Sequence, residues 1–152
     1  VLSQFIEDRK REGENLKSDL LEKLSTLDEC AAFFKKWQPE MEKRFREQIS
    51  AKFHELLADK ADENRIMTET AAMIVKYTIN EEIIRLQSHL QALRKEINEN
   101  PIPGKKIDFI CQEANREINT IGSKNQFTEV GEKVIDAKNA LENIREQGKN
   151  IE

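Results

Sequence analysis

The sequence predicts an all-α protein. Apolar residues recur at intervals of three and four along most of the chain, the spacing that places side chains on one side of a helix. Only five glycines and three prolines interrupt the pattern in 152 residues, and no stretch alternates between apolar and polar residues as a half-buried strand does. Charged residues make up 36% of the chain, a proportion that suits amphipathic helices burying one stripe each.

The first segment, residues 1–61, is predicted to form a long helical hairpin. Gly13 is a weak point of the first helix, at a cost of about 1 kcal/mol relative to Ala. Pro39 marks a break or the first turn of the second helix. We expect Leu2–Trp37 to pair with Pro39–Ala58, with Trp37 as a packing anchor at the tip. The two apolar seams are Leu16, Leu20, Leu24, Leu27, Ala31 and Phe34, and then Met41, Phe45, Ile49, Phe53 and Leu57. A structural or oligomerising arm is favoured over a catalytic one.

The second segment, residues 62–152, is predicted to form a compact helical bundle. Asp62 can cap its first helix, and Thr78 with Glu81 has the spacing of a capping box for the next. The run from Asn98 to Gly104, with two prolines, is the strongest helix breaker in the chain. A helix from about residue 105 to 121 follows, then a loop around Gly122, and a last helix from about residue 128. The inward residues of the second and last helices are Ile83, Leu86, Leu90, Leu93, Ile97, Val130, Val134, Ala137, Leu141 and Ile144.

Composition narrows the class of protein. The net charge of −4 neither indicates nor excludes nucleic-acid binding, because local basic stripes matter more than the total. Cys30 and Cys111 form no CxxC motif, so a disulfide framework or zinc finger is not expected and the cytoplasm is the expected compartment. We find no apolar run of roughly 18 residues, no signal peptide and no small-molecule cofactor motif. The start at Val1 suggests a piece of a longer protein.

The helix from Lys105 carries two polar strips beside its apolar stripe. Asp108, Gln112, Asn115, Arg116 and Asn119 share one side, and Glu113, Glu117 and Thr120 lie beside them. Phe109 falls among these polar residues. A solvated face explains the charges, but it explains the amide side chains poorly because Asn is a weak helix former. Periodicity alone leaves a functional site and a solvated face equally open.

The preceding helix has a matching polar strip with Glu81, Glu82, Arg85, Ser88 and His89. If the two helices pack antiparallel, Glu82, His89, Asp108, Glu113 and Glu117 can approach one region. Carboxylates with a histidine suit a hard divalent ion, Mg²⁺ or Mn²⁺, which can polarise a phosphoryl oxygen and activate water. Lys105, Lys106, Arg116 and Lys124 would then contact phosphates, and Phe109 would stack on an unpaired base.

These residues carry a resemblance to a known family. From Gly104 the chain reads GKKIDFICQEANREINTIGSK, which closely resembles the signature of the bacterial YicC/YloC family of stress-associated endoribonucleases. The earlier EEIIRLQSH and the later ENIREQGKNIE match two further stretches in the same order, and Glu12-Gly13 with Asp19-Leu20 fits the start of the family's C-terminal half.

The resemblance implies a metal-dependent endoribonuclease that acts on single-stranded or looped RNA and assembles as a homo-oligomer, with a hexamer expected. It also implies an N-terminal domain that this chain lacks. The positions that match the family pattern are Glu82, Arg85, His89, Asp108, Gln112, Glu113, Arg116, Glu117, Asn119, Ser123 and Lys124. Of these, the resemblance favours His89, Asp108, Glu113 and Glu117 as catalytic residues. It favours the others except Glu82 as RNA-binding residues, namely Arg85, Gln112, Arg116, Asn119, Ser123 and Lys124. Thr78 departs from a usual Asp, and Ile84 from a usual polar residue.

Two other functions stay open at this point. The chain can be a non-catalytic RNA-binding and oligomerisation module, in which the polar strips form ion pairs between subunits. It can also be only the oligomerisation half of an enzyme whose chemistry lies in the absent domain.

Overall fold

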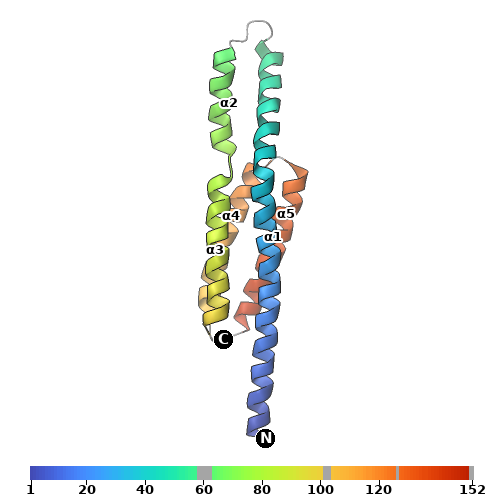
Figure 1. Ribbon diagram of the computed structural model, residues 1–152, viewed down its shortest axis with the longest axis vertical. Coiled ribbons are helices and arrows are strands. Elements are labelled where there is room, and N and C mark those ends of the chain that lie inside the picture. Colours follow the sequence, from blue (N-terminus) through green and yellow to red (C-terminus); the bar gives the residue numbers. More distant parts are fainter. Residues whose placement is uncertain (58–62, 101–103, 126, 151–152) are drawn as a thin grey trace.

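The protein is built from α-helices alone across the residues that the structure describes. The computed structural model describes residues 1–57, 63–100, 104–125 and 127–150. In these ranges the elements are α1 (Leu2–Leu57), α2 (Glu63–Tyr77), α3 (Asn80–Glu99), α4 (Gly104–Lys124) and α5 (Thr128–Lys149) (Figure 1). The all-α prediction is confirmed.

Four of the helices form an antiparallel bundle. The middle part of α1 packs against α3 and α5, and α4 packs against the same two helices, so α1 and α4 occupy opposite corners (Figure 1). Each helix in this ring runs opposite to both of its neighbours. Such up-down packing needs only short connections.

The core of the bundle uses the apolar seams expected from the sequence. Along α3 the buried side chains recur at three- and four-residue steps, as an amphipathic helix requires. The same spacing continues on the facing sides of α4 and α5. The largest fully buried side chains are Phe34, Leu20, Leu24, Leu27, Ile79, Ile83, Leu86, Leu90, Leu93, Ile107, Ile118 and Ile121.

The hairpin predicted inside residues 2–58 is wrong. Pro39 lies inside α1, which continues without a turn from Leu2 to Leu57. Before the proline, Phe33 stacks on Trp37 at 6.0 Å between ring centroids. Beyond it, the Arg44 guanidinium lies over the Trp37 ring at 4.9 Å and also contacts Phe127 and Glu129 near the start of α5. Contacts within α1 and to α5 therefore support a helix that the proline alone would weaken.

A different helical hairpin exists at the end of α1. Beyond the bundle, α2 returns alongside the last part of α1 (Figure 1). We call residues 42–57 of α1 together with α2 the arm. The expected cap at Asp62 lies outside the described residues, and the division of the chain into domains at residues 61 and 62 stays a prediction.

At its other end α1 extends past the bundle into solvent. Every residue from 1 to 15 is exposed, and the apolar Leu2, Phe5 and Ile6 are 74%, 57% and 59% exposed. The first four turns of α1 therefore contribute nothing to the bundle's core.

Two predicted helix boundaries differ from the structure. The side chain of Thr78 does not cap α3, whose N-cap is Ile79 with no side-chain hydrogen bond. Helix α4 does not end at residue 121 but continues through Gly122 to Lys124. A Cβ atom at Gly122 would lie 3.2 Å from Val134, so glycine here permits a close approach of α4 to α5. The predicted break near residues 98–104 is confirmed by the end of α3 at Glu99 and the start of α4 at Gly104, with 101–103 outside the described residues.

Among the described residues, none of the helices combines the length and the apolar character that a bilayer crossing requires.

Candidate functional site

The two polar strips on α4 face two different neighbouring helices. Asp108 accepts a hydrogen bond from Arg145 of α5 at 3.0 Å, whereas Glu117 accepts one from Arg85 of α3 at 3.0 Å. Asp108 and Glu117 are nine residues apart, about 14 Å along the helix axis. They therefore belong to two separate groups of polar residues.

A ladder of opposite charges connects α3 and α4, and we call it the α3/α4 ladder. Its rungs are Glu82–Lys124 at 2.7 Å, Arg85–Glu117 at 3.0 Å and Glu96–Lys106 at 3.8 Å. Because the helices run antiparallel, residue numbers rise along α3 as they fall along α4. The ladder lies directly beside the apolar seam of both helices, so it shields that seam from water on one side.

His89 and Glu113 occupy the level between two of these rungs. Four residues beyond Arg85 on α3 is His89, and four residues before Glu117 on α4 is Glu113. Both side chains are partly buried. Glu113 also lies 3.8 Å from the exposed Arg116. The register of the ladder thus brings this histidine and this carboxylate to the same height on the two helices.

Glu82 and Glu117 are the two charged residues that are buried among the described positions. Glu117 is held by Arg85, and Glu82 Oε1 accepts a hydrogen bond from the Lys124 ammonium and lies 3.7 Å from Arg85. Glu82 Oε2 is buried without a hydrogen-bond partner. Two buried carboxylates are tolerable here because one arginine and one lysine neutralise them.

The ion pairs also favour the charged form of Arg85 and Arg145. The hydrogen bond to Glu117 raises the pKa of the Arg85 guanidinium, and the hydrogen bond to Asp108 raises the pKa of Arg145. Each ion pair therefore favours the protonated form of its arginine.

The five residues predicted as metal ligands are not gathered into one cluster. Glu82 and Glu117 approach the same arginine, but Asp108 pairs with Arg145 of α5. In the part of the chain that the structure describes, no three His, Cys, Asp or Glu side chains are placed to hold a metal ion. A divalent ion bound through Glu82, His89, Asp108, Glu113 and Glu117 stays a prediction.

Most of the predicted RNA-contacting residues face solvent. Phe109 is 63% exposed, which confirms that it stands outside the core. Lys105, Lys106, Gln112, Arg116, Asn119 and Ser123 are exposed as well. We call Lys105, Phe109, Gln112 and Arg116 the outer face of α4. They follow one another at intervals of four, three and four residues and so line one side of the helix.

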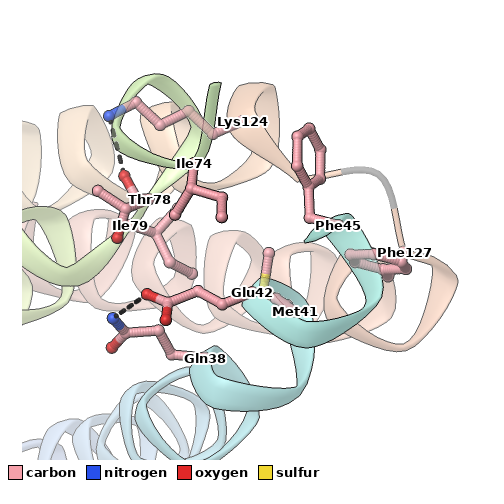
Figure 2. Close-up of a pocket in the computed structure, with 9 residues that line it drawn as sticks. All are labelled: Gln38, Met41, Glu42, Phe45, Ile74, Thr78, Ile79, Lys124 and Phe127. Atoms are coloured by element: carbon pink, nitrogen blue, oxygen red, sulfur yellow. Dashed lines mark hydrogen bonds between the residues drawn. The ribbon is translucent and has the colours of Figure 1, made fainter. Parts of the chain in front are cut away.

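Lys124 differs from the other predicted contacts. Its ammonium donates to the Thr78 carbonyl at 3.1 Å and to Glu82 at 2.7 Å, so it is engaged inside the protein. Figure 2 shows this side chain reaching Thr78 beside a small cavity. Because the Thr78 contact uses a backbone carbonyl, the departure from Asp at this position leaves it unaffected. Ile84, the other departure, is 57% exposed.

Two residues of the polar network were missed from the sequence. Arg145 completes the Asp108 pair, and Glu96 completes the Lys106 pair. Both pairs depend on which helices are neighbours, so no local pattern could reveal them. Glu81, which the sequence places on the polar strip, lies 3.4 Å from Arg85 four residues later on the same helix.

Comparison with known proteins identifies related sequences. Residues 34–152 match the family described as "Endoribonuclease YicC-like, C-terminal". The probable endoribonuclease YicC of Clostridioides difficile (strain 630) is 37% identical over 162 residues, which cover all of this chain and 55% of that protein. The probable endoribonuclease YicC of Haemophilus influenzae (strain ATCC 51907 / DSM 11121 / KW20 / Rd) is 28% identical over 152 residues, covering all of this chain and 53% of that protein. The chain thus spans about half the length of these relatives.

Proposed function

Because this chain belongs to the endoribonuclease YicC-like family, we propose that it forms part of an enzyme that cleaves phosphodiester bonds within RNA. The observation that carries this proposal is the outer face of α4, where a largely exposed Phe109 stands between exposed cations. An exposed aromatic residue on a helix has no packing role in the bundle, so it is available to a ligand.

The outer face suits an unpaired RNA strand. Lys105 and Arg116 offer positive charge to phosphates, and phosphate neutralisation dominates nucleic-acid affinity. Phe109 offers a flat surface on which an unpaired base stacks, with a typical contribution of about 1–3 kcal/mol per base. A base inside a duplex is not free to stack in this way. The proposed substrate is therefore single-stranded or looped RNA.

His89 and Glu113 are the groups that we propose for proton transfer. Cleavage of a phosphodiester requires that an attacking hydroxyl lose a proton and that the leaving oxygen gain one. A histidine is the side chain most often used for this exchange near neutral pH. Arg85 lies one turn away and its side chain is 48% exposed, so it can contact the phosphate while Glu117 orients it.

We also propose that cleavage requires Mn²⁺ or Mg²⁺, a requirement that the cleavage assay measures directly. The described residues of one chain do not offer three ligands together, so no step of the reaction is assigned to an ion. Self-association to a homo-oligomer, with a hexamer expected, is a further proposal that rests on the family resemblance. A cytoplasmic location is another, and it rests on the pattern of the cysteines.

An RNA cleavage time course of the full-length protein tests the proposed function. We expect His89→Ala together with Glu113→Gln to lower kcat by about 100-fold or more, and Phe109→Ala to raise KM. Ile135→Ala, at an exposed position on α5, is the matched control and should change neither constant. Titration with Mn²⁺, Mg²⁺ and EDTA in the same assay measures the metal requirement. Unchanged cleavage by the double variant overturns the proposed roles of His89 and Glu113.

A second function is favoured by the pairing of the charged residues. Arg85, Lys124 and Arg145 are each engaged with carboxylates, as in a structural network that leaves chemistry to another part of the protein. The alternative is thus a non-catalytic RNA-binding and oligomerisation module. RNA binding that is insensitive to EDTA and yields no new RNA ends would support it.

A further inference from the structure

The arm and the bundle are joined at two points that lie at the same level. One point is on α1 near Pro39, and the other is the two-residue gap between α2 and α3 (Figure 1). Met41 and Ile79, from these two points, line one small cavity together (Figure 2). Any bend between arm and bundle must pass through both points.

Regular helical hydrogen bonding is interrupted at both points. Pro39 has no N–H, so the carbonyl four residues earlier loses its helical hydrogen bond. On the other side, Thr78 and Ile79 are not helical, and the N-cap Ile79 makes no side-chain cap. Kinks in helical structures occur at prolines and at breaks of this kind.

The packing of apolar side chains also distinguishes the arm from the bundle. The connected core of the bundle includes Met41 and Ile79 but not the buried Ile49 and Ile66 of the arm. Between the two lies the cavity of Figure 2, about 20 Å³ in volume, which is room for about one water molecule. An interface with a void and no continuous core resists bending less than a close-packed interior does.

Lys124 bridges the junction from a third helix. It is the last residue of α4, and its ammonium binds the Thr78 carbonyl just after α2 and the Glu82 carboxylate in the first turn of α3. A cation is favoured where helices α2 and α4 end, and an anion is favoured where α3 begins. The charges of three helix ends are thus satisfied around one side chain.

Arg44 makes a second contact at the junction. Its guanidinium lies over the rings of Trp37 and Phe127 and is 3.3 Å from Glu129. Arg44 is itself on the arm, so this contact fastens the base of the arm to the start of α5. The Arg44 contacts are half exposed, whereas Glu82, which Lys124 contacts, is buried.

We propose that the arm pivots on the bundle about Pro39 and the Thr78–Ile79 gap, and that Lys124 is the positioning residue that holds the arm in line with the bundle. This inference concerns motion of the scaffold and does not rest on the proposed RNA cleavage. Loss of the Lys124 ammonium leaves the end of α2 and Glu82 without their shared partner, so the range of arm orientations widens.

Distances between spin labels on the arm and on the bundle test the pivot. Labels are placed at Lys52→Cys in the arm and Lys138→Cys in α5, both at exposed positions of the full chain. The native Cys30 and Cys111 stay unlabelled, because burial raises the pKa of both thiols. We expect Lys124→Met to broaden the distance distribution by about twofold, as a shift in population among arm orientations requires.

Matched variants separate the pivot from a general loss of structure. Lys105→Met, at the other end of the same helix, should leave the distribution unchanged. Pro39→Ala restores the missing N–H and should narrow it. A Lys124→Met distribution that superimposes on the parent overturns the role of Lys124. If Lys124→Met lowers the helical content, Pro39→Ala decides the matter, and a width equal to the parent's overturns the pivot.

Discussion

Arg85 is surrounded by three carboxylates from two helices. It donates to Glu117 at 3.0 Å and lies within 3.7 Å of both Glu81 and Glu82. Removing a charge from such a group is costly chiefly because the partner stays buried and uncompensated. Replacing both partners with apolar residues avoids that cost.

We therefore expect Arg85→Met to lower the melting temperature by about 5 °C or more, and Arg85→Met with Glu117→Leu to recover most of the loss. Thermal unfolding followed by circular dichroism measures both. A double variant no more stable than Arg85→Met would show that the pair is not the source of the effect.

Gly148 shows a second residue-scale constraint. A Cβ atom at this position would lie 3.0 Å from Ile107 Cγ2, and Ile107 is fully buried. Because β-branched side chains are stiff at χ1, Ile107 has little room to move aside. The glycine thus permits close contact between the end of α5 and the start of α4.

We expect Gly148→Ala to reduce the free energy of unfolding by about 1–2 kcal/mol through overpacking. Gly131→Ala is the matched control on the same helix, because its Cβ would meet Asn125 at an ordinary 3.6 Å. That control should gain up to about 1 kcal/mol from helix propensity. Urea unfolding measures both, and equal gains would contradict the clash.

At the scale of elements, the sequence predicted α3 and α5 well and α1 poorly. Periodic apolar residues specify a helix and its buried side, so the seam of α3 from Ile83 to Ile97 was read correctly. Pro39 suggested a turn, but α1 continues past it. Arg44 lies over Trp37 within the helix and also pairs with Glu129, 85 residues further along the chain. At the start of α3, Lys124 reaches the Thr78 carbonyl across 46 residues, a contact that the local capping pattern could not predict.

The exposed start of α1 gives a prediction for one element. Deleting residues 1–15 should change the melting temperature by less than about 2 °C, because surface groups outside the core contribute little. Deleting residues 1–24 removes the buried Leu20 and Leu24 as well, and each lost leucine should cost roughly 2–5 kcal/mol. Scanning calorimetry of both truncated chains measures the difference. A large loss from the shorter deletion would show that the projecting turns are packed.

At the scale of the whole molecule, the sequence predicted which residues belong to the candidate site but not which helices they face. The sequence placed Asp108 and Glu117 on two polar strips of one helix, and Phe109 outside the core, which the structure confirms. It could not say that α5 lies against one strip and α3 against the other, because that depends on the order of helices around the bundle. Ion pairs such as Asp108–Arg145 follow from this order.

Alkaline unfolding tests the integrity of the whole core. Burial raises the pKa of Cys111 from 9.0 to about 12. The folded chain therefore keeps a proton that the unfolded chain loses, so this contribution to stability is complete below pH 9 and is lost as the pH rises toward 12.

We expect the free energy of unfolding to fall by about 1 kcal/mol between pH 8 and pH 10 on account of this thiol. Cys111→Ala should show a smaller fall over the same range, even if its stability is lower at every pH. Urea unfolding at each pH measures both slopes. Equal slopes in the two proteins would contradict the assignment.

The unbroken course of α1 has a mechanical consequence. The helix is 56 residues long, about 84 Å at 1.5 Å per residue, and the part beyond Pro39 is about 27 Å of that length. A change of about 10° in direction at the proline moves the far tip by about 5 Å, roughly one helical turn. A small change in the direction of α1 at Pro39 therefore produces a displacement of several ångströms at the far end of the helix.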